Sequence, residues 1–327
     1  MSSTFPQLLL EHAARRPHEP ALRVKEYGIW QTTSWAALAD QVRELAGGFA
    51  AAGMKRNDHL VVVGENRPRL SAAMLAAQTL GAIPIPLYQD AVSAEFVFPI
   101  NNADVRFAVV EDQEQVDKML EIREQCPQLQ HIWFDDPRGL RNYEESGLSS
   151  MDDLQAQGAQ HAAQHPGFFD QAVQQCKPQD VAAMFFTSGT TGNPKGVVHT
   201  HHSLLDRASA GAKFDHLTEH EEVLAYLPPA WIGQNIFSYA QWLACGYVVN
   251  CPESASTVMI DLKEIGPTYY FAPPRIFEGL LTSVMIRMED AGAFKRGLFH
   301  HFMALARRVG PDLADGKSVG QIGRAHV

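Results

Sequence analysis

The residues of this chain with the clearest capacity for chemistry lie together in Thr187–Gly196, which has the sequence Thr-Ser-Gly-Thr-Thr-Gly-Asn-Pro-Lys-Gly. The stretch contains three glycines, four hydroxyl side chains and one lysine, and it has no apolar side chain to bury. The runs on both sides, Val181–Phe186 and Val197–Thr200, are typical of strands. We therefore expect an exposed loop held between two strands.

An oxyanion is the ligand that this loop suits. Glycines let backbone N–H groups approach a ligand closely, successive N–H groups form an anion-binding nest, and a lysine adds a point charge. A simple hairpin turn is the alternative, but it needs only about two to five loop residues. A Walker A loop is excluded, because Asn193 and Pro194 precede the lysine and no Ser or Thr follows it. The residues expected to bind phosphate are Thr187, Ser188, Gly189, Thr190, Thr191, Gly192 and Lys195.

The same stretch resembles the phosphate-loop signature of the adenylate-forming superfamily, which includes acyl-CoA synthetases, luciferases and the adenylation domains of peptide synthetases. Thr187–Gly196 meets every position of the pattern Thr-Ser-Gly-Thr-Thr-Gly-x-Pro-Lys-Gly. The resemblance implies that this loop holds the phosphates of ATP and that Lys195 is a catalytic residue. It also implies that Thr187 lies close to Mg²⁺.

Two further stretches resemble acyl-CoA synthetases. Asp58–Val63, followed by Asn66 and Gly81–Pro84, is similar to their early core block, and Ala272–Glu278 is similar to a Val-Pro-Arg-x-(Phe/Tyr)-Glu run of the long-chain branch. The resemblance implies ATP-dependent activation of a carboxylic acid, a fatty acid, to an acyl-adenylate and its transfer to coenzyme A. An aryl-CoA ligase, an acyl-AMP ligase and a non-catalytic nucleotide-binding pseudoenzyme stay open as alternatives.

Three residues between the loop and the end of the chain are candidates for substrate contact. Leu227–Trp231 lies where the family has a Leu-Pro-x-x-His or similar segment, with a tryptophan replacing the histidine or smaller residue. Trp231 is either a core tryptophan or a wall of the acyl pocket, and the two interpretations carry equal weight. Gln234 and Asn235 are polar groups in an apolar run, so they either contact the substrate or form hydrogen bonds within a helix.

Other polar clusters have simpler interpretations. A zinc site needs about three or four converging ligands, and a boundary between a strand and a helix scatters His199, His201 and His202. We interpret these histidines as structural. The carboxylate pairs Asp135-Asp136 and Glu221-Glu222 are interpreted as solvated loop ends.

The resemblance covers only part of a family member. The family's Gly-Tyr-Gly-x-Thr-Glu segment with its magnesium glutamate, its ribose aspartate and its C-terminal catalytic lysine have no match here. Ile322–Val327 resembles the in-frame translation of a sequencing adapter. We expect residues 1–180 and 181–321 to be successive parts of one truncated N-terminal AMP-binding domain, and 322–327 to be a non-native tail. The fragment alone is expected to have little ligase activity.

Composition limits the class of protein. The chain has 327 residues, 46% of them hydrophobic and 20% charged, as in ordinary globular proteins. A net charge of −10 argues against nucleic-acid binding and against a polybasic membrane anchor.

The four cysteines lack Cys-x-x-Cys spacing and the first residues lack a signal-peptide layout, so we expect a reduced, cytoplasmic compartment. Prolines and amides divide the uncharged stretches Leu70–Gln89 and Val223–Pro252, which argues against a transmembrane segment. Peripheral membrane association stays open.

The elements that must position the loop alternate between strand and helix. Ser34 has the position of an N-cap for a helix through Ala52. Farther along, apolar strands separated by helical patterns predict parallel sheets covered by helices. The predicted fold class is α/β, the layered αβαβα core of an adenylate-forming N-terminal domain, incomplete at this length. We also expect one short helix at Met151–Gln157 within a polar surface excursion, a helix at Trp231–Ala244 and a strand at Tyr269–Ala272.

Overall fold

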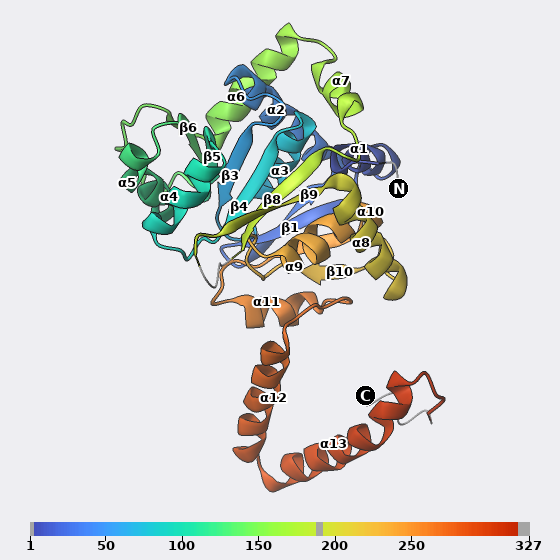
Figure 1. Ribbon diagram of the computed structural model, residues 1–327. Helices are drawn as coiled ribbons and strands as arrows, with labels where there is room; N and C mark the ends of the chain where they lie inside the picture. The colour runs from blue at the N-terminus through green and yellow to red at the C-terminus, as the bar shows by residue number, and fades with distance from the viewer. Residues whose placement is uncertain (1–2, 188–191, 320–327) are drawn as a thin grey trace. The chain divides into compact units, whose positions relative to one another are not determined.

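The structure of the protein, a computed structural model, describes residues 3–187 and 192–319 (Figure 1). The chain divides into two compact units, Met1–Tyr270 and Phe271–Val327. Within the described residues, the first unit contains three β-sheets and the second contains two helices. The expected foreign tail at residues 322–327 lies outside the described residues.

A parallel sheet of five strands forms one layer of the first unit. Its strands and connecting helices are β3 (His59–Val63), α3 (Pro68–Thr79), β4 (Ile83–Leu87), α4 (Ser93–Asn102), β5 (Phe107–Val110), α5 (Gln113–Glu121), β6 (His131–Phe134) and β7 (Leu148–Ser150). The strand order is β4-β3-β5-β6-β7, and every residue of β4 and β5 is buried. From β3 the chain crosses to β4 on one side and then returns to β5 on the other. The carboxyl ends of β3 and β5 therefore flank a topological switch point, where α/β proteins commonly bind ligands.

A second sheet joins segments that lie far apart in the sequence. Its strands are β1 (Pro20–Glu26), β2 (Ile29–Ser34), β10 (Glu222–Leu224) and β11 (Val248–Cys251). The order is β10-β11-β1-β2, with β1 parallel to β11 and antiparallel to β2. The turn between β1 and β2 places Tyr27 and Gly28 at φ of 49° and 76°, a left-handed pair typical of tight hairpins.

The third sheet is the predicted strand–loop–strand unit. The strand β8 (Val181–Thr187) pairs antiparallel with β9 (Lys195–Thr200), and Thr187 lies opposite Lys195. The strand β8 runs beside β4, so this hairpin lies against the edge of the five-stranded sheet (Figure 1). The prediction that the chain returns into a strand after the loop is confirmed.

Helices cover the sheets and enclose the main core. They are α1 (Phe5–Arg15), α2 (Trp35–Ala51), α6 (Met151–Gln164), α7 (Phe168–Gln175) and α8 (His201–Phe214). The predicted N-cap of α2 is confirmed, because the Ser34 side chain accepts a hydrogen bond from the Ala37 N–H at 3.2 Å. The single short helix expected at Met151–Gln157 is wrong in extent, since α6 continues to Gln164 and α7 follows it. Gly158 lies within α6, and its lack of a side chain allows α6 to approach α2 closely.

The predicted helix at Trp231–Ala244 contains an irregular turn. It consists of α9 (Ile232–Asn235), a π-helical turn (Ile236–Ala240) and α10 (Gln241–Cys245). Single π-helical turns are rare and frequently occur at functional sites. After β11 comes α11 (Val258–Ile265). The strand expected at Tyr269–Ala272 is wrong, because this segment makes only an isolated bridge from Tyr269 to Val223.

The second unit contains α12 (Pro274–Glu289) and α13 (Ala293–Ala314), and neither helix has a buried residue. None of the described helices is long and apolar enough to span a membrane. The parallel sheets and their covering helices confirm the predicted α/β class.

Candidate active site

The two ends of the predicted phosphate loop are held by the ladder of β8 and β9. Thr187 Oγ1 donates a hydrogen bond to the Lys195 carbonyl at 3.5 Å, across the last pair of the hairpin. Lys195 is exposed, and among the described residues its ammonium group has no ion pair. A side chain built at Gly192 would meet no atom of the described residues within 4 Å. The other expected phosphate-binding residues, Ser188, Gly189, Thr190 and Thr191, lie outside the described residues.

Close packing fixes the position of the hairpin. Phe185 of β8 is buried in the main body of the first unit. A Cβ atom at Gly196 would lie 2.8 Å from the Met184 sulfur, so the glycine lets β9 lie flat against β8. The strands thus form a packed base, and Lys195 lies at one end of it.

A second group of predicted residues lines a small cavity at the carboxyl end of β3. The cavity has a volume of about 30 Å³, and Gln234 and Asn235 are in its wall. Both are buried, with 6% and 5% of their surfaces exposed. Asn66, at the switch point, is in the wall as well: its Nδ2 donates to the Leu227 carbonyl at 2.8 Å, and its Oδ1 accepts from Gln234 Nε2 at 2.9 Å.

Trp231 lies at the start of the same helix but does not line this cavity. Its side chain is 40% exposed, so the interpretation as a core tryptophan is wrong. Because Trp231 precedes the helix and much of its ring lies outside the core, the ring can form an outer wall of the acyl pocket. That role stays a prediction.

A buried polar chain connects the cavity to the phosphate hairpin. Tyr239, in the π-helical turn and in the cavity wall, donates its hydroxyl to Gln78 Oε1 at 2.8 Å. Gln78 Nε2 in turn donates to the Ala182 carbonyl of β8 at 2.8 Å. Burial raises the pKa of Tyr239 well above its usual range, so this hydroxyl stays a proton donor. The two candidate sites therefore share one hydrogen-bonded support.

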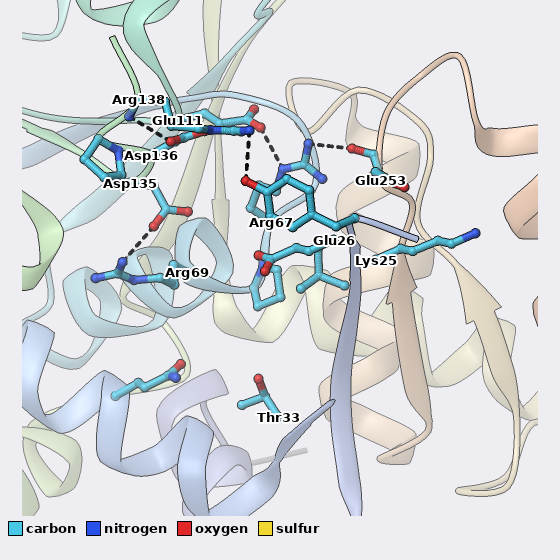
Figure 2. Close-up of a pocket in the computed structure, with 15 residues that line it drawn as sticks. Lys25, Glu26, Thr33, Arg67, Arg69, Glu111, Asp135, Asp136, Arg138 and Glu253 are labelled. Atoms are coloured by element: carbon cyan, nitrogen blue, oxygen red, sulfur yellow. Dashed lines mark hydrogen bonds and ion pairs between the residues drawn. The ribbon is translucent and has the colours of Figure 1, made fainter. Parts of the chain in front are cut away.

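A larger, charged cavity of about 570 Å³ lies at the carboxyl ends of β5 and β6 (Figure 2). Arg67 is its central cation: the guanidinium donates to Glu111 at 2.6 Å and to the carbonyls of Pro252 and Glu253 at 2.8 Å and 3.0 Å. Arg67 also lines the small cavity, so it forms the partition between the two. Its bonds tie the loop after β3 to β5 and to the segment after β11.

The interpretation of Asp135 and Asp136 as solvated loop ends is wrong. Asp135 is only 17% exposed and pairs with Arg69 at 3.0 Å, and Asp136 pairs with Arg138 (Figure 2). Burial raises the pKa of Asp135 to about 6, with a smaller contribution from the nearby Glu111 carboxylate. The position of both residues directly after a parallel strand was the signal that could have located them.

Glu222 is also no solvated loop end. Its carboxylate accepts from Arg23 at 2.8 Å and from Asn250 Nδ2 at 2.8 Å, which joins β10 to its neighbours β11 and β1. Glu111, like Asp135 and Asp136, directly follows a parallel strand, whereas Arg67 and Glu222 carry no local motif that sequence reasoning could have used.

The profile of one protein family, described as AMP-binding enzyme, matches residues 9–315. The chain belongs to the AMP-binding enzyme family. The resemblance that the phosphate loop carried is thereby confirmed, and it extends over nearly the whole chain.

The relatives of this chain include long-chain-fatty-acid–CoA ligases. ACSBG2 of Xenopus laevis is 25% identical over 316 residues, which cover 94% of this chain and 41% of the relative. Human ACSBG2 is 26% identical over 326 residues, covering 97% of this chain and 47% of the relative. The chain therefore spans less than half the length of these curated relatives.

Solved structures support the fold. The adenylation domain of a carboxylate reductase from Mycobacterium chelonae superposes with a TM-score of 0.73 at 17% identity, covering 89% of this chain and 49% of that one. At this identity the likeness concerns the fold alone.

Of the histidines that follow the loop, His201 has a structural role. His201 is buried at the start of α8, and its Nδ1 accepts a hydrogen bond from the Phe5 N–H of α1 at 3.3 Å. Burial lowers the pKa of His201 to about 4, so the ring is neutral and can accept this bond at neutral pH. No group of three or more His, Cys, Asp or Glu side chains within the described ranges is arranged to hold a metal ion.

Proposed function

We propose that this chain is the core of an enzyme that activates a carboxylic acid with ATP and transfers the acyl group to coenzyme A. In the first step a carboxylate oxygen attacks the α-phosphorus of ATP, and the bond to pyrophosphate breaks. In the second, a thiol sulfur displaces AMP from the acyl-adenylate. The observation that carries the proposal is the hairpin of β8 and β9, whose last ladder pair, Thr187 and Lys195, joins the two ends of a full adenylate-forming signature.

The residues present fit the ATP phosphates. Lys195 supplies a cation with no competing ion pair among the described residues, and Thr187 supplies a hydroxyl at the other end of the same ladder pair. Fixed donors and cations of this kind stabilise the charge that develops on a transferring phosphoryl group. Mg²⁺ would neutralise further phosphate charge. We assign Thr187, the loop hydroxyl that the structure describes, to a position near this ion. Ser188, Gly189, Thr190, Thr191 and Gly192 would supply the remaining donors.

The acid is proposed to lie beside α9 and the π-helical turn. Gln234 and Asn235 line the cavity there, and Trp231 would form its outer wall. A fatty acid is the proposed substrate class, because the relatives described above are named as long-chain-fatty-acid–CoA ligases. We further propose that residues 1–180 and 181–321 are successive parts of one domain. The free cysteines, three buried and one partly buried, are consistent with a reduced cytoplasmic compartment.

Nucleotide binding tests the proposal directly. Lys195→Ala removes a charged contact worth about 1.5–3 kcal/mol, so we expect ATP affinity to fall roughly 10- to 100-fold. Isothermal titration of ATP–Mg²⁺ into the purified chain measures this change. Lys213→Ala is the matched control, since Lys213 is an exposed lysine at the end of α8.

Equal ATP affinities for the two variants would contradict the role of Lys195. Acid-dependent exchange of pyrophosphate into ATP then tests the chemistry. Residues 1–327 are expected to show little exchange, and the longest reading frame of the gene is expected to show more. An absence of exchange in that longer protein would favour a nucleotide-binding pseudoenzyme.

A further inference from the structure

The small cavity at the switch point has amide side chains whose orientation is settled by backbone carbonyls. The Leu227 carbonyl can only accept a hydrogen bond, so the Asn66 atom that meets it must be Nδ2. The other polar atom of the Asn66 amide is therefore the oxygen, Oδ1. That oxygen faces Gln234, and the group it meets must therefore be the Gln234 nitrogen, at 2.9 Å. Asn66 thus fixes which end of the Gln234 amide is free.

The neighbouring amide is held in the same way. Asn235 Nδ2 donates to the carbonyls of Pro229 and Trp231 at 2.6 Å and 2.9 Å. Both nitrogens, those of Gln234 and Asn235, are therefore used for internal hydrogen bonds. Neither amide oxygen has a hydrogen bond with any described residue, and neither is among the fully enclosed unpaired atoms. These two oxygens are the polar atoms that the Gln234 and Asn235 side chains have left to offer a ligand, and Glu65, Ser71 and Ser238 also line the cavity.

The size and surroundings of the cavity define what such a ligand presents. A volume of about 30 Å³ admits a group the size of a water molecule or a hydroxyl, not a length of hydrocarbon chain. Gln234 and Asn235 are nine-tenths buried, so a ligand group that enters there loses its contact with bulk water. Leaving an amide oxygen unpaired against a purely apolar ligand is costly, whereas a donor restores its hydrogen bond.

We propose that Asn66 is a positioning residue that makes this cavity select acids carrying a hydrogen-bond donor, a hydroxyl or an amino group, on their chain. This inference rests on the proposed function, because it assumes that the acid binds beside α9. It narrows the substrate class from unsubstituted fatty acids to hydroxylated or aminated ones. Asn66 acts through Gln234, while Gln234 and Asn235 contact the substituent.

Paired ligands provide the test. Octanoate is compared with its hydroxy derivatives and with its amino derivatives, substituted at successive carbons, by titration calorimetry with the purified chain. The wild type is expected to bind at least one substituted acid about 3- to 10-fold more tightly than octanoate, as one added neutral hydrogen bond allows. The hydroxy and amino series distinguish a neutral donor from a cationic one.

Four variants separate positioning from general stability. Gln234→Leu removes the acceptor, and we expect the preference for the substituted acid over octanoate to disappear while octanoate still binds. Asn66→Ala frees the Gln234 amide to rotate and should reduce the preference at least by half. Asn66→Asp retains an oxygen for Gln234 Nε2 and should restore part of it. Asn102→Ala, at an exposed asparagine of α4, should leave the preference unchanged.

The outcomes distinguish this inference from the proposed function. If acids bind but octanoate and its derivatives bind equally, or if Gln234→Leu retains the preference, the selection of donors is wrong. If Asn66→Ala and Asn66→Asp behave alike in affinity and preference, Asn66 has no positioning role. If no acid binds while ATP does, the location of the acid and the inference are both overturned. Loss of ATP binding in the wild type would overturn the proposed function itself.

Discussion

Asp135 is a residue whose ionised form the fold disfavours. Burial raises its pKa from 3.8 to about 6, although Arg69 lies 3.0 Å away and opposes the shift. Well below the ordinary pKa of 3.8 the carboxyl is protonated in both the folded and the unfolded state, so its contribution to stability does not change with pH. Between pH 4 and 6 the folded state binds more protons, so the stability contribution falls as pH rises, by about 3 kcal/mol at most. We expect Asp135→Asn to remove this fall.

Chemical denaturation of the wild type and of Asp135→Asn at pH 4 and at pH 7 measures the effect. The variant should gain stability relative to the wild type as pH rises. This holds even if loss of the ion pair with Arg69 lowers the variant's free energy of unfolding at both pH values. Arg69 keeps a second carboxylate, that of Asp152 at 2.7 Å, which limits that loss.

Asp136 is the matched contrast. Its hydrogen bond with Arg138 lowers the pKa of the Asp136 carboxyl, so its stabilising contribution is present above the unfolded pKa and is lost in acid. Asp136→Asn should therefore change the pH dependence in the opposite direction. The same sign for both variants would contradict these assignments.

The site residues that could be predicted from sequence are those whose role depends on local spacing. Thr187 and Lys195 are near neighbours in the chain, and the glycines between them specify a loop whatever surrounds it. Asn66 and Gln234 are 168 positions apart, and only the meeting of the loop after β3 with α9 brings them together. Asp135 was misjudged for the same reason, because its ion-pair partner, Arg69, lies in α3.

At the scale of elements, the packing of α2 on α6 depends on glycines. A Cβ atom at Gly158 would lie 1.7 Å from the Glu44 carbonyl oxygen and 2.7 Å from the Gly48 nitrogen. Both contacts are with backbone atoms of α2, which cannot move aside as the end of a side chain could. We expect Gly158→Ala to destabilise the protein by about 1–3 kcal/mol or more, because the helices must separate. Equilibrium unfolding in urea measures this change.

Gly279→Ala is the control for helix propensity. Gly279 lies within α12, and a Cβ atom there would meet nothing within 4 Å. Since alanine favours a helix over glycine by about 0.5–1 kcal/mol, this variant should be neutral or slightly more stable. Similar stabilities for the two variants would contradict the close approach of α2 and α6.

The helices and strands that could be located from the sequence are those with a local signal. The start of α2 was predictable because Ser34 supplies a local N-cap. The length of α6 was not, because Gly158 weakens a helical pattern locally while its benefit lies in contact with another helix. The strand expected at Tyr269–Ala272 failed in the opposite way: the pattern favoured a strand, but only Tyr269 has a bridge partner.

At the scale of the whole molecule, alternating strands and helices were enough to predict an α/β protein with parallel sheets. They could not predict that β1 pairs with β11, whose partner residues Leu22 and Val249 come from distant parts of the chain. Hydrophobic patterns specify that a strand is buried on its faces. They carry no information about which edge of a sheet the strand joins.

The two units should differ in how firmly their helices are held. Isolated helices of about 15 residues are marginal in water, and most helical stability in proteins comes from packing of an apolar face. In α12, which has 16 residues, none is buried, and Phe277 and Leu281 are 50% and 51% exposed. In α3, by contrast, ten of its 12 residues are buried.

We expect amide hydrogens of α12 and α13 to exchange at least ten-fold faster than those of α3. Hydrogen–deuterium exchange with mass spectrometry of the intact chain measures this, with α2 as a second protected reference. Protection of α12 equal to that of α3 would mean that its apolar side chains are covered in solution, and exchange that slows with rising protein concentration would identify a second copy of the chain as the cover.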